Sequence, residues 1–210
     1  MPSSASIETK AASRDALLDA AEEVIVRQGI GSLSFEIVAK EAKLSKSGLL
    51  HHFPTKDALI DALVARKVCG HQADYEAAIK AEPVGPGRAS RAVLGLCLSS
   101  TDKWTETLRR RGLVMMAALV HNPVHIEPLR AFRRDLAAKV GTDGLPSGVG
   151  EAVRLAIDGL WFTWIFGLSE LTPSKLAAVR GALEKLLEAS VEKGDAGARK
   201  RPAPKRSGRS

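Results

Sequence analysis

Apolar residues along this chain recur at helical spacing, three or four positions apart. The first segment runs from Arg14 to Gln28, with an apolar stripe of Leu17, Leu18, Ala21, Val24 and Ile25. Because positions three and four apart share one face of an α-helix, this segment predicts an amphipathic helix. Gly29 follows at the place where a glycine commonly ends a helix. Alternation of apolar and polar residues is nowhere sustained over a strand length, so we expect an all-α fold.

Two short helices are predicted between Ser34 and Phe53. The apolar face of the first consists of Phe35, Val38, Ala39 and Ala42, and Ser34 precedes it as a good N-cap. Leu44 leaves no room for a long loop, and Ser45 caps a second helix from Lys46 to His51. A helix, a turn of about three residues and a helix form a helix-turn-helix, whose second helix enters the DNA major groove. On spacing alone, an ordinary helix pair with solvated lysines is the alternative.

Helical patterns continue through the rest of the chain between clear stop signals. Thr55 is the predicted N-cap of a long helix from Lys56 to about Lys80, which the loop of residues 82–87 ends. Later helices are predicted at residues 88–100, 104–121, 126–140, 151–168 and 173–190, and Thr101 or Asp102 would cap the second of these. The total is about nine helices.

The last two predicted helices suit a subunit interface. From Ile157 onward the first is apolar on every side, so it must be buried all round. The second follows a Thr172-Pro173 start signal and repeats apolar or small residues at Leu176, Val179, Leu183, Leu186 and Ser190. Two such helices per subunit predict a four-helix interface in a homodimer. The alternative is that both helices complete the core of a monomer.

Residues around the helix-turn-helix form a longer pattern. Its members are Leu17-Leu18-Asp19-Ala20-Ala21, Gly29, Ser34, Ile37-Val38-Ala39-Lys40-Glu41-Ala42, Leu44-Ser45-Lys46-Ser47, His52-Phe53, Lys56 and Leu59. Together they resemble the DNA-binding region of the tetracycline-repressor (TetR/AcrR) family of bacterial transcriptional regulators. The segment of residues 158–162, DGLWF, resembles the regulatory half of that family more loosely.

The resemblance implies a fold and a function. It implies an N-terminal three-helix DNA-binding domain and a C-terminal helical domain for ligand binding and dimerisation. The implied function is sequence-specific regulation of transcription, by a repressor that a small apolar or amphipathic ligand releases from palindromic double-stranded DNA. The alternative is a helical protein that binds a small molecule or a partner and lacks operator binding. We divide the chain into an unstructured arm (1–13), the DNA-binding domain (14–57), the regulatory domain (58–193) and an unstructured basic tail (194–210).

The candidate DNA contacts lie on and beside the second short helix. Base-edge or groove contacts are expected from Ser45, Lys46, Ser47 and His51, and Gly48 allows a close backbone approach. Phosphate contacts are expected from Ser34, Lys56 and His52. Lys56 has the alternative of a solvated lysine, and His52 that of packing next to Phe53. The family usually has a tyrosine at the position of Leu50; Leu50 lacks the hydroxyl that would touch a phosphate, and His51 is the candidate replacement.

A ligand pocket is expected among the helices between residues 88 and 168, again by resemblance. Methionine and aromatic residues suit an adaptable apolar wall with few polar anchors. The candidate wall residues are Trp104, Met115, Met116, Leu119, His121, Phe132, Trp161, Trp164 and Phe166. For each residue taken alone, plain core packing is the alternative.

Charge and cysteine content change this interpretation little. The net charge is +7, but residues 1–57 hold seven basic and eight acidic residues, whereas the tail holds six basic and one acidic residue. The overall charge is therefore weak support for DNA binding, and the tail either adds nonspecific DNA affinity or solubilises the chain. Two cysteines far apart in sequence, Cys69 and Cys97, are expected to be buried, reduced thiols, which fits a cytoplasmic protein. The longest apolar run is too short to span a membrane, and the N-terminus lacks the apolar segment of a secretory signal.

The sequence favours neither an enzyme nor a cofactor-binding protein. It contains no GxSxG motif, Walker loop or dinucleotide fingerprint. His121 and His125 lie four residues apart, but Pro123 interrupts the helix between them and Glu127 is the only carboxylate nearby in sequence. We therefore expect no metal site there and no cofactor.

Overall fold

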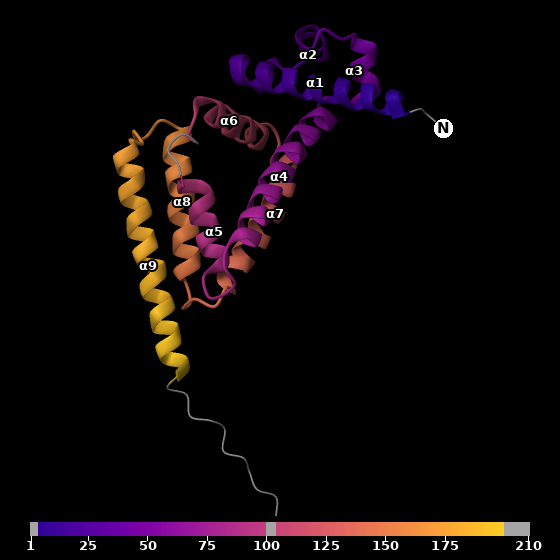
Figure 1. Cartoon of the computed structure of the whole chain (residues 1–210). Coiled ribbons are helices and arrows are strands. Elements are labelled where there is room, and N and C mark those ends of the chain that lie inside the picture. The colour runs from indigo at the N-terminus through magenta and orange to yellow at the C-terminus, as the bar shows by residue number, and fades with distance from the viewer. Residues whose placement is uncertain (1–3, 100–103, 200–210) are drawn as a thin grey trace, which may run out of the picture. The chain divides into compact units, whose positions relative to one another are not determined.

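The computed structural model describes residues 4–99 and 104–199. Over these residues the protein is all-α, as predicted, with nine α-helices and two short 3-10 helices (Figure 1). The elements are α1 (Ser4–Gln28), η1 (Ile30–Ser32), α2 (Phe35–Glu41), α3 (Lys46–His52), α4 (Lys56–Ala81), α5 (Arg88–Leu98), α6 (Glu106–His121), η3 (Pro123–Ile126), α7 (Glu127–Gly141), α8 (Val149–Ile165) and α9 (Pro173–Arg199). No helix in the described part of the chain is both long and apolar enough to cross a membrane.

The chain forms two compact units that do not follow its linear order. The first comprises Met1–Ala73, Asp102–Arg134 and Trp164–Leu168. The second comprises Asp74–Thr101, Asp135–Thr163 and Ser169–Ser210. The helix-turn-helix thus shares its unit with α6 and the start of α7, whereas we had placed everything after residue 57 in a separate regulatory domain.

The core of the first unit contains the apolar stripes that the sequence predicts. Every predicted stripe residue of α1 is buried, namely Leu17, Leu18, Ala21, Val24 and Ile25. Val38 and Ala39 of α2, Leu49 of α3 and Phe53 are buried as well. In Figure 1, α2 and α3 lie against α1, and helix contacts connect all three. Helices as short as α2 and α3 are stable only through such packing.

Charged side chains from later in the chain hold α1 in place. Arg66 of α4 contacts Asp19 at 2.8 Å, and Lys67 contacts Glu22 at 2.7 Å. α6 also packs against α1 and η1, and Arg110 of α6 lies 3.5 Å from Glu23. The acidic face of α1 is therefore paired with basic residues from α4 and α6.

The turn between α2 and α3 closes on a residue with unusual backbone geometry. Lys43 has a φ of 55°, in the left-handed region where glycine is the usual residue. The N–H of Leu44 donates to the Ala39 carbonyl at 2.9 Å, and the N–H of Lys43 donates to the Lys40 carbonyl at 3.2 Å. This pair of bonds is a Schellman motif, which satisfies the last carbonyls of α2 within a very short connection.

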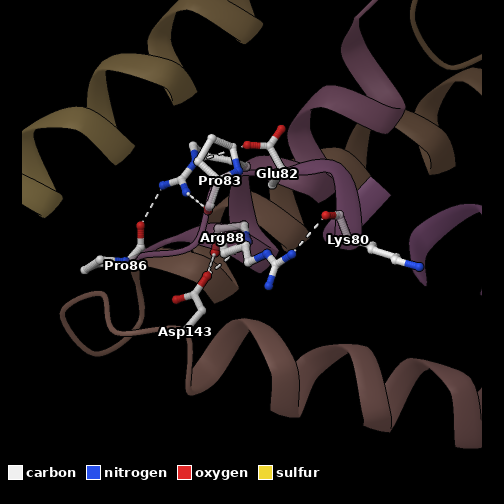
Figure 2. Close-up of polar contacts among 8 residues, drawn as sticks. Lys80, Glu82, Pro83, Pro86, Arg88 and Asp143 are labelled. Carbon is white, nitrogen blue, oxygen red and sulfur yellow. Dashed lines mark hydrogen bonds and ion pairs between the residues drawn. The ribbon is translucent and has the colours of Figure 1, made fainter. Parts of the chain in front are cut away.

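In the second unit, Asp143 holds the start of α5. Its Oδ2 accepts hydrogen bonds from the backbone N–H of Ser90 at 3.0 Å and from the Ser90 hydroxyl at 2.7 Å. Its backbone carbonyl accepts from the N–H of Gly87 at 2.7 Å. A carboxylate is favourable here because the first N–H groups of a helix lack partners within the helix. Figure 2 shows this corner beside Arg88, which donates to the Lys80 carbonyl at 3.0 Å.

The start of α8 packs closely against the same corner. A Cβ atom added to Gly150 would lie 2.5 Å from the backbone oxygen of Val140 and 2.6 Å from the hydroxyl oxygen of Ser90. Both distances are shorter than real Cβ contacts. Glycine is therefore required at this position by the close approach of α7 and α5.

At both ends of the chain the described helices extend past the predicted boundaries. α1 begins at Ser4, inside the predicted arm, and α9 continues to Arg199, inside the predicted tail. Once a helix is nucleated, each added residue forms a further hydrogen bond, so a helix can extend past its apolar stripe. The remaining parts of both predictions, residues 1–3 and 200–210, lie outside the described residues.

Two further local predictions concern α6 and α8. The N-cap of α6 is Thr105, whose hydroxyl accepts from the N–H of Leu108 at 3.2 Å; the predicted caps, Thr101 and Asp102, lie outside the described residues. α8 is not buried all round, because Phe162 is 57% exposed in the single chain. The cysteines also differ from the prediction of buried thiols, since Cys69 is exposed and Cys97 is half-buried.

Candidate functional site

A serine caps each helix of the helix-turn-helix, Ser34 at α2 and Ser45 at α3, the predicted recognition helix. The hydroxyl of Ser34 accepts from the N–H of Ile37 at 3.3 Å, and the hydroxyl of Ser45 accepts from the N–H of Gly48 at 3.0 Å. Both caps agree with the prediction, as does that of Thr55 on the N–H of Ala58 at 3.0 Å. The caps supply partners for N–H groups that the first helical turn leaves unpaired.

One face of α3 is buried and the rest is open. Leu49 is fully buried and anchors the helix, whereas Lys46, Ser47, Leu50 and His51 are exposed. Leu50, at the family's tyrosine position, is 41% exposed. Ser45 is exposed too, and its hydroxyl lies 3.1 Å from that of Ser47. The four predicted groove contacts, Ser45, Lys46, Ser47 and His51, are thus all accessible to solvent.

Lys46 has a partner that the sequence did not suggest. Its ammonium group donates a hydrogen bond to the carboxylate of Glu36, which lies in the first turn of α2. This hydrogen bond lowers the pKa of the Glu36 carboxyl below its ordinary value. Both side chains are largely exposed, so the pair bridges the two helices at the surface and Lys46 remains within reach of solvent.

The predicted phosphate contacts lie around α3 in different surroundings. Lys56 is half-buried, and its ammonium group donates to the Ile30 carbonyl at 3.2 Å. Gly48 is half-buried, and a Cβ there would lie 3.2 Å from the Ser45 hydroxyl oxygen. His52 is half-buried with its ring 6.2 Å from that of Phe53, an arrangement that favours the packing alternative for this residue.

Two family models match the sequence. Residues 17–63 match the model for bacterial regulatory proteins of the tetR family, and residues 87–188 match the tetracyclin repressor-like C-terminal domain. The chain belongs to the TetR family. It is therefore a DNA-binding transcriptional regulator and not an enzyme, which confirms both predictions. No curated protein matches this TetR-family sequence at a significant level.

Solved structures show the same TetR fold at low sequence identity. SCO7518 from Streptomyces coelicolor A3(2) is 17% identical, with a TM-score of 0.62 over 83% of this chain and 98% of that one. GusR from Salmonella enterica is 19% identical, with a TM-score of 0.59 over 84% and 95% of the two chains. The multidrug binding protein EbrR, complexed with malachite green, is 24% identical, with a TM-score of 0.57 over 83% and 97%.

The predicted ligand-wall residues of this TetR-family protein divide between its two units. Trp161 is half-buried in the second unit, and the others belong to the first. Trp104 and Trp164 lie together, with ring centroids 5.1 Å apart at an interplanar angle of 75°. Met115 and Phe132 are buried, Met116 and Leu119 are half-buried, and Phe166 is exposed.

His121, the remaining wall candidate, lies in a cluster with His125 and two aspartates that the sequence did not indicate. Its ring stacks on that of His125, with centroids 5.9 Å apart and an interplanar angle of 6°. Asp57 and Asp61, from the first two turns of α4, reach the same place. No spacing signal connects these aspartates to the histidines, because more than sixty positions separate Asp61 from His125 in the chain.

Proposed function

We propose that this TetR-family regulator is a dimeric repressor that leaves a palindromic operator when a small apolar or amphipathic ligand binds. The observation that carries the proposal is the open face of α3, where Lys46, Ser47, Leu50 and His51 are exposed around the buried anchor Leu49. Serine, lysine and histidine side chains supply hydrogen-bond donors for base edges, and an exposed leucine can contact a thymine methyl group. In a dimer, two such helices read half-sites roughly 34–36 Å apart.

The dimer part of the proposal rests on exposed apolar side chains in the second unit. Leu155 and Phe162 are 53% and 57% exposed, and their spacing of seven residues places them on one face of α8. Leu186 of α9 is also exposed. Large exposed apolar side chains on neighbouring positions mark protein interfaces. Phe162→Glu should give a monomer in size-exclusion chromatography with light scattering, whereas Val84→Glu, which changes an exposed apolar loop residue, should not.

The DNA-binding test compares sequence preference with overall affinity. A fragment from upstream of the protein's own gene and a shuffled fragment are titrated at two salt concentrations. If Lys46 reads a base, Lys46→Ala should reduce the preference for the native fragment by about 1–3 kcal/mol. Lys56→Ala should weaken binding to both fragments and reduce the salt slope by about one. Lys80→Ala removes the same charge from an exposed position in the second unit and should change neither quantity.

The ligand part of the proposal requires a molecule that prefers the DNA-free state. Malachite green, which EbrR binds, is a suitable first probe because it is amphipathic and aromatic. Its binding should change the fluorescence of the Trp104–Trp164 pair and lower operator affinity by roughly 5- to 150-fold, the usual range of allosteric coupling. A probe that changes the fluorescence and leaves operator affinity unchanged would contradict release by that ligand.

A further inference from the structure

Four side chains converge where the start of α4 meets the end of α6 and η3. All four belong to the first compact unit. Asp57 Oδ1 lies 3.5 Å from His125 Nε2 and 3.8 Å from His121 Nε2. Asp61 Oδ1 lies 2.7 Å from His125 Nδ1. One ligand atom each from Asp57, His121 and His125 falls within 4.8 Å of the others.

The bonding of His125 leaves a lone pair directed into this cluster. The side chain of His125 is 3% exposed, and its Nδ1–H donates to the carboxylate of Asp61. In the neutral ring Nε2 is then an acceptor, and it is buried without a hydrogen-bond partner. Another acceptor, the carboxylate of Asp57, lies 3.5 Å from it. A buried lone pair facing a carboxylate is unfavourable unless a cation, either a proton or a metal ion, lies between them.

The distances suit a transition-metal ion. Metal–ligand bonds of about 2.0–2.2 Å in a tetrahedral zinc site place neighbouring ligand atoms roughly 3.3–3.6 Å apart. The distances from Asp57 to the two histidines are close to that value. The third distance, between the ligand nitrogens of His121 and His125, is within 4.8 Å, and a small rotation of the exposed His121 side chain can shorten it. Imidazole and carboxylate ligands together suit Zn²⁺, Ni²⁺ or Co²⁺ better than Ca²⁺ or Mg²⁺, which prefer oxygen alone.

We propose that Asp57, His121 and His125 form a binding site for a divalent transition-metal ion of the zinc type, with Asp61 as the positioning residue. A carboxylate that accepts the second ring N–H of a ligating histidine fixes its tautomer and orientation. Three protein ligands leave the fourth tetrahedral position for water, as in exchangeable zinc sites. The ion would connect the first turn of α4, which carries the phosphate candidate Lys56, to the end of α6.

The test is a metal titration of the full-length, tag-free protein after removal of metal with a chelator. Zn²⁺ measured by calorimetry should bind once per chain, and Co²⁺ should give the visible absorption of a tetrahedral site. Asp57→Asn and His121→Gln change exposed residues, so both variants should fold, and each should lose at least ten-fold in affinity. Asp61→Asn should lose about 10- to 100-fold while the shape of the Co²⁺ spectrum stays unchanged.

His71→Gln is the matched control, because His71 is an exposed histidine of α4 outside the cluster. Its affinity for Zn²⁺ should equal that of the wild type. Thermal unfolding gives a second measurement, since Zn²⁺ should raise the Tm of the wild type and the control and leave that of His121→Gln unchanged. The proposal is wrong if no saturable binding occurs, or if the Asp57 and His121 variants bind Zn²⁺ as tightly as the wild type. The titration needs no DNA, so its outcome is independent of the repressor proposal.

Discussion

Gly150→Ala should destabilise the protein, although alanine is the better helix former. The new Cβ would lie 2.5 Å from the Val140 oxygen, about 0.9 Å inside the 3.4 Å at which ordinary contact begins. Overpacking of this kind costs about 1–3 kcal/mol. Displacement of the Ser90 hydroxyl would also weaken its hydrogen bond to the Asp143 carboxylate. Hydrogen bonds to charged groups contribute about 1.5–3 kcal/mol. The helix-propensity gain of alanine offsets at most about 1 kcal/mol, so we expect a net loss of about 1–3 kcal/mol.

The matched control is Gly70→Ala in α4. Nothing lies within 4 Å of a Cβ added there, and the residue is exposed. This substitution should therefore raise the free energy of unfolding by about 0.5–1 kcal/mol. The two substitutions make the same chemical change inside a helix, and they should move stability in opposite directions.

Urea unfolding followed by circular dichroism measures both effects at one fixed protein concentration, since dimerisation would couple to unfolding. With a slope of about 2 kcal/mol/M, Gly150→Ala should lower the midpoint by about 0.5–1.5 M at constant slope. A midpoint for Gly150→Ala equal to or above that of the wild type would refute the close packing of α5, α7 and α8 around this residue.

Three further predictions concern the helix-turn-helix. Lys43→Gly should raise the free energy of unfolding by about 0.5–1 kcal/mol, because glycine removes the left-handed strain at φ 55°. The control Lys40→Gly, within α2, should lower it by about 1 kcal/mol, and equal changes in unfolding free energy would contradict the Schellman turn. In an NMR pH titration the Glu36 carboxyl should have a pKa below its ordinary value, so its hydrogen bond to Lys46 persists at neutral pH and is lost as the pH falls through that pKa. Lys46→Met should raise the pKa of Glu36, and an unchanged pKa would exclude the Glu36–Lys46 bond. Ser45→Ala should cost about 1 kcal/mol of stability through the lost cap on Gly48, measured by urea unfolding, and a loss below about 0.3 kcal/mol would show that water replaces the hydroxyl.

Local sequence signals were sufficient to predict the helices and the helix-turn-helix. Ser34, Ser45 and Thr55 each cap the helix that follows them, because an N-cap depends on residues only three positions away. The α1 stripe is buried as its spacing predicts. By contrast, the left-handed turn at Lys43 carries no glycine signal, so its geometry could not be inferred from the residue type.

Interactions between distant segments were beyond the sequence analysis. The metal candidates illustrate this, since His121 and His125 were noticed and dismissed for lack of a nearby carboxylate, which α4 supplies through Asp57. Charge counting failed for the same reason. The acidic residues of α1 were counted against DNA binding within residues 1–57, but Arg66 and Lys67, beyond that boundary, are paired with them. A net charge summed over a stretch of sequence ignores partners from elsewhere.

The attachment of α6 to α1 limits how regulators of this kind can be recombined. A chimera joined at residue 57 would keep the helix-turn-helix but lose Arg66, Lys67 and Arg110, which pair with the acidic side chains of α1. It would also lose the α6 surface on which α1 and η1 pack. To transfer operator specificity to another regulator, α6 and the first turns of α4 would therefore have to be transferred together with the helix-turn-helix.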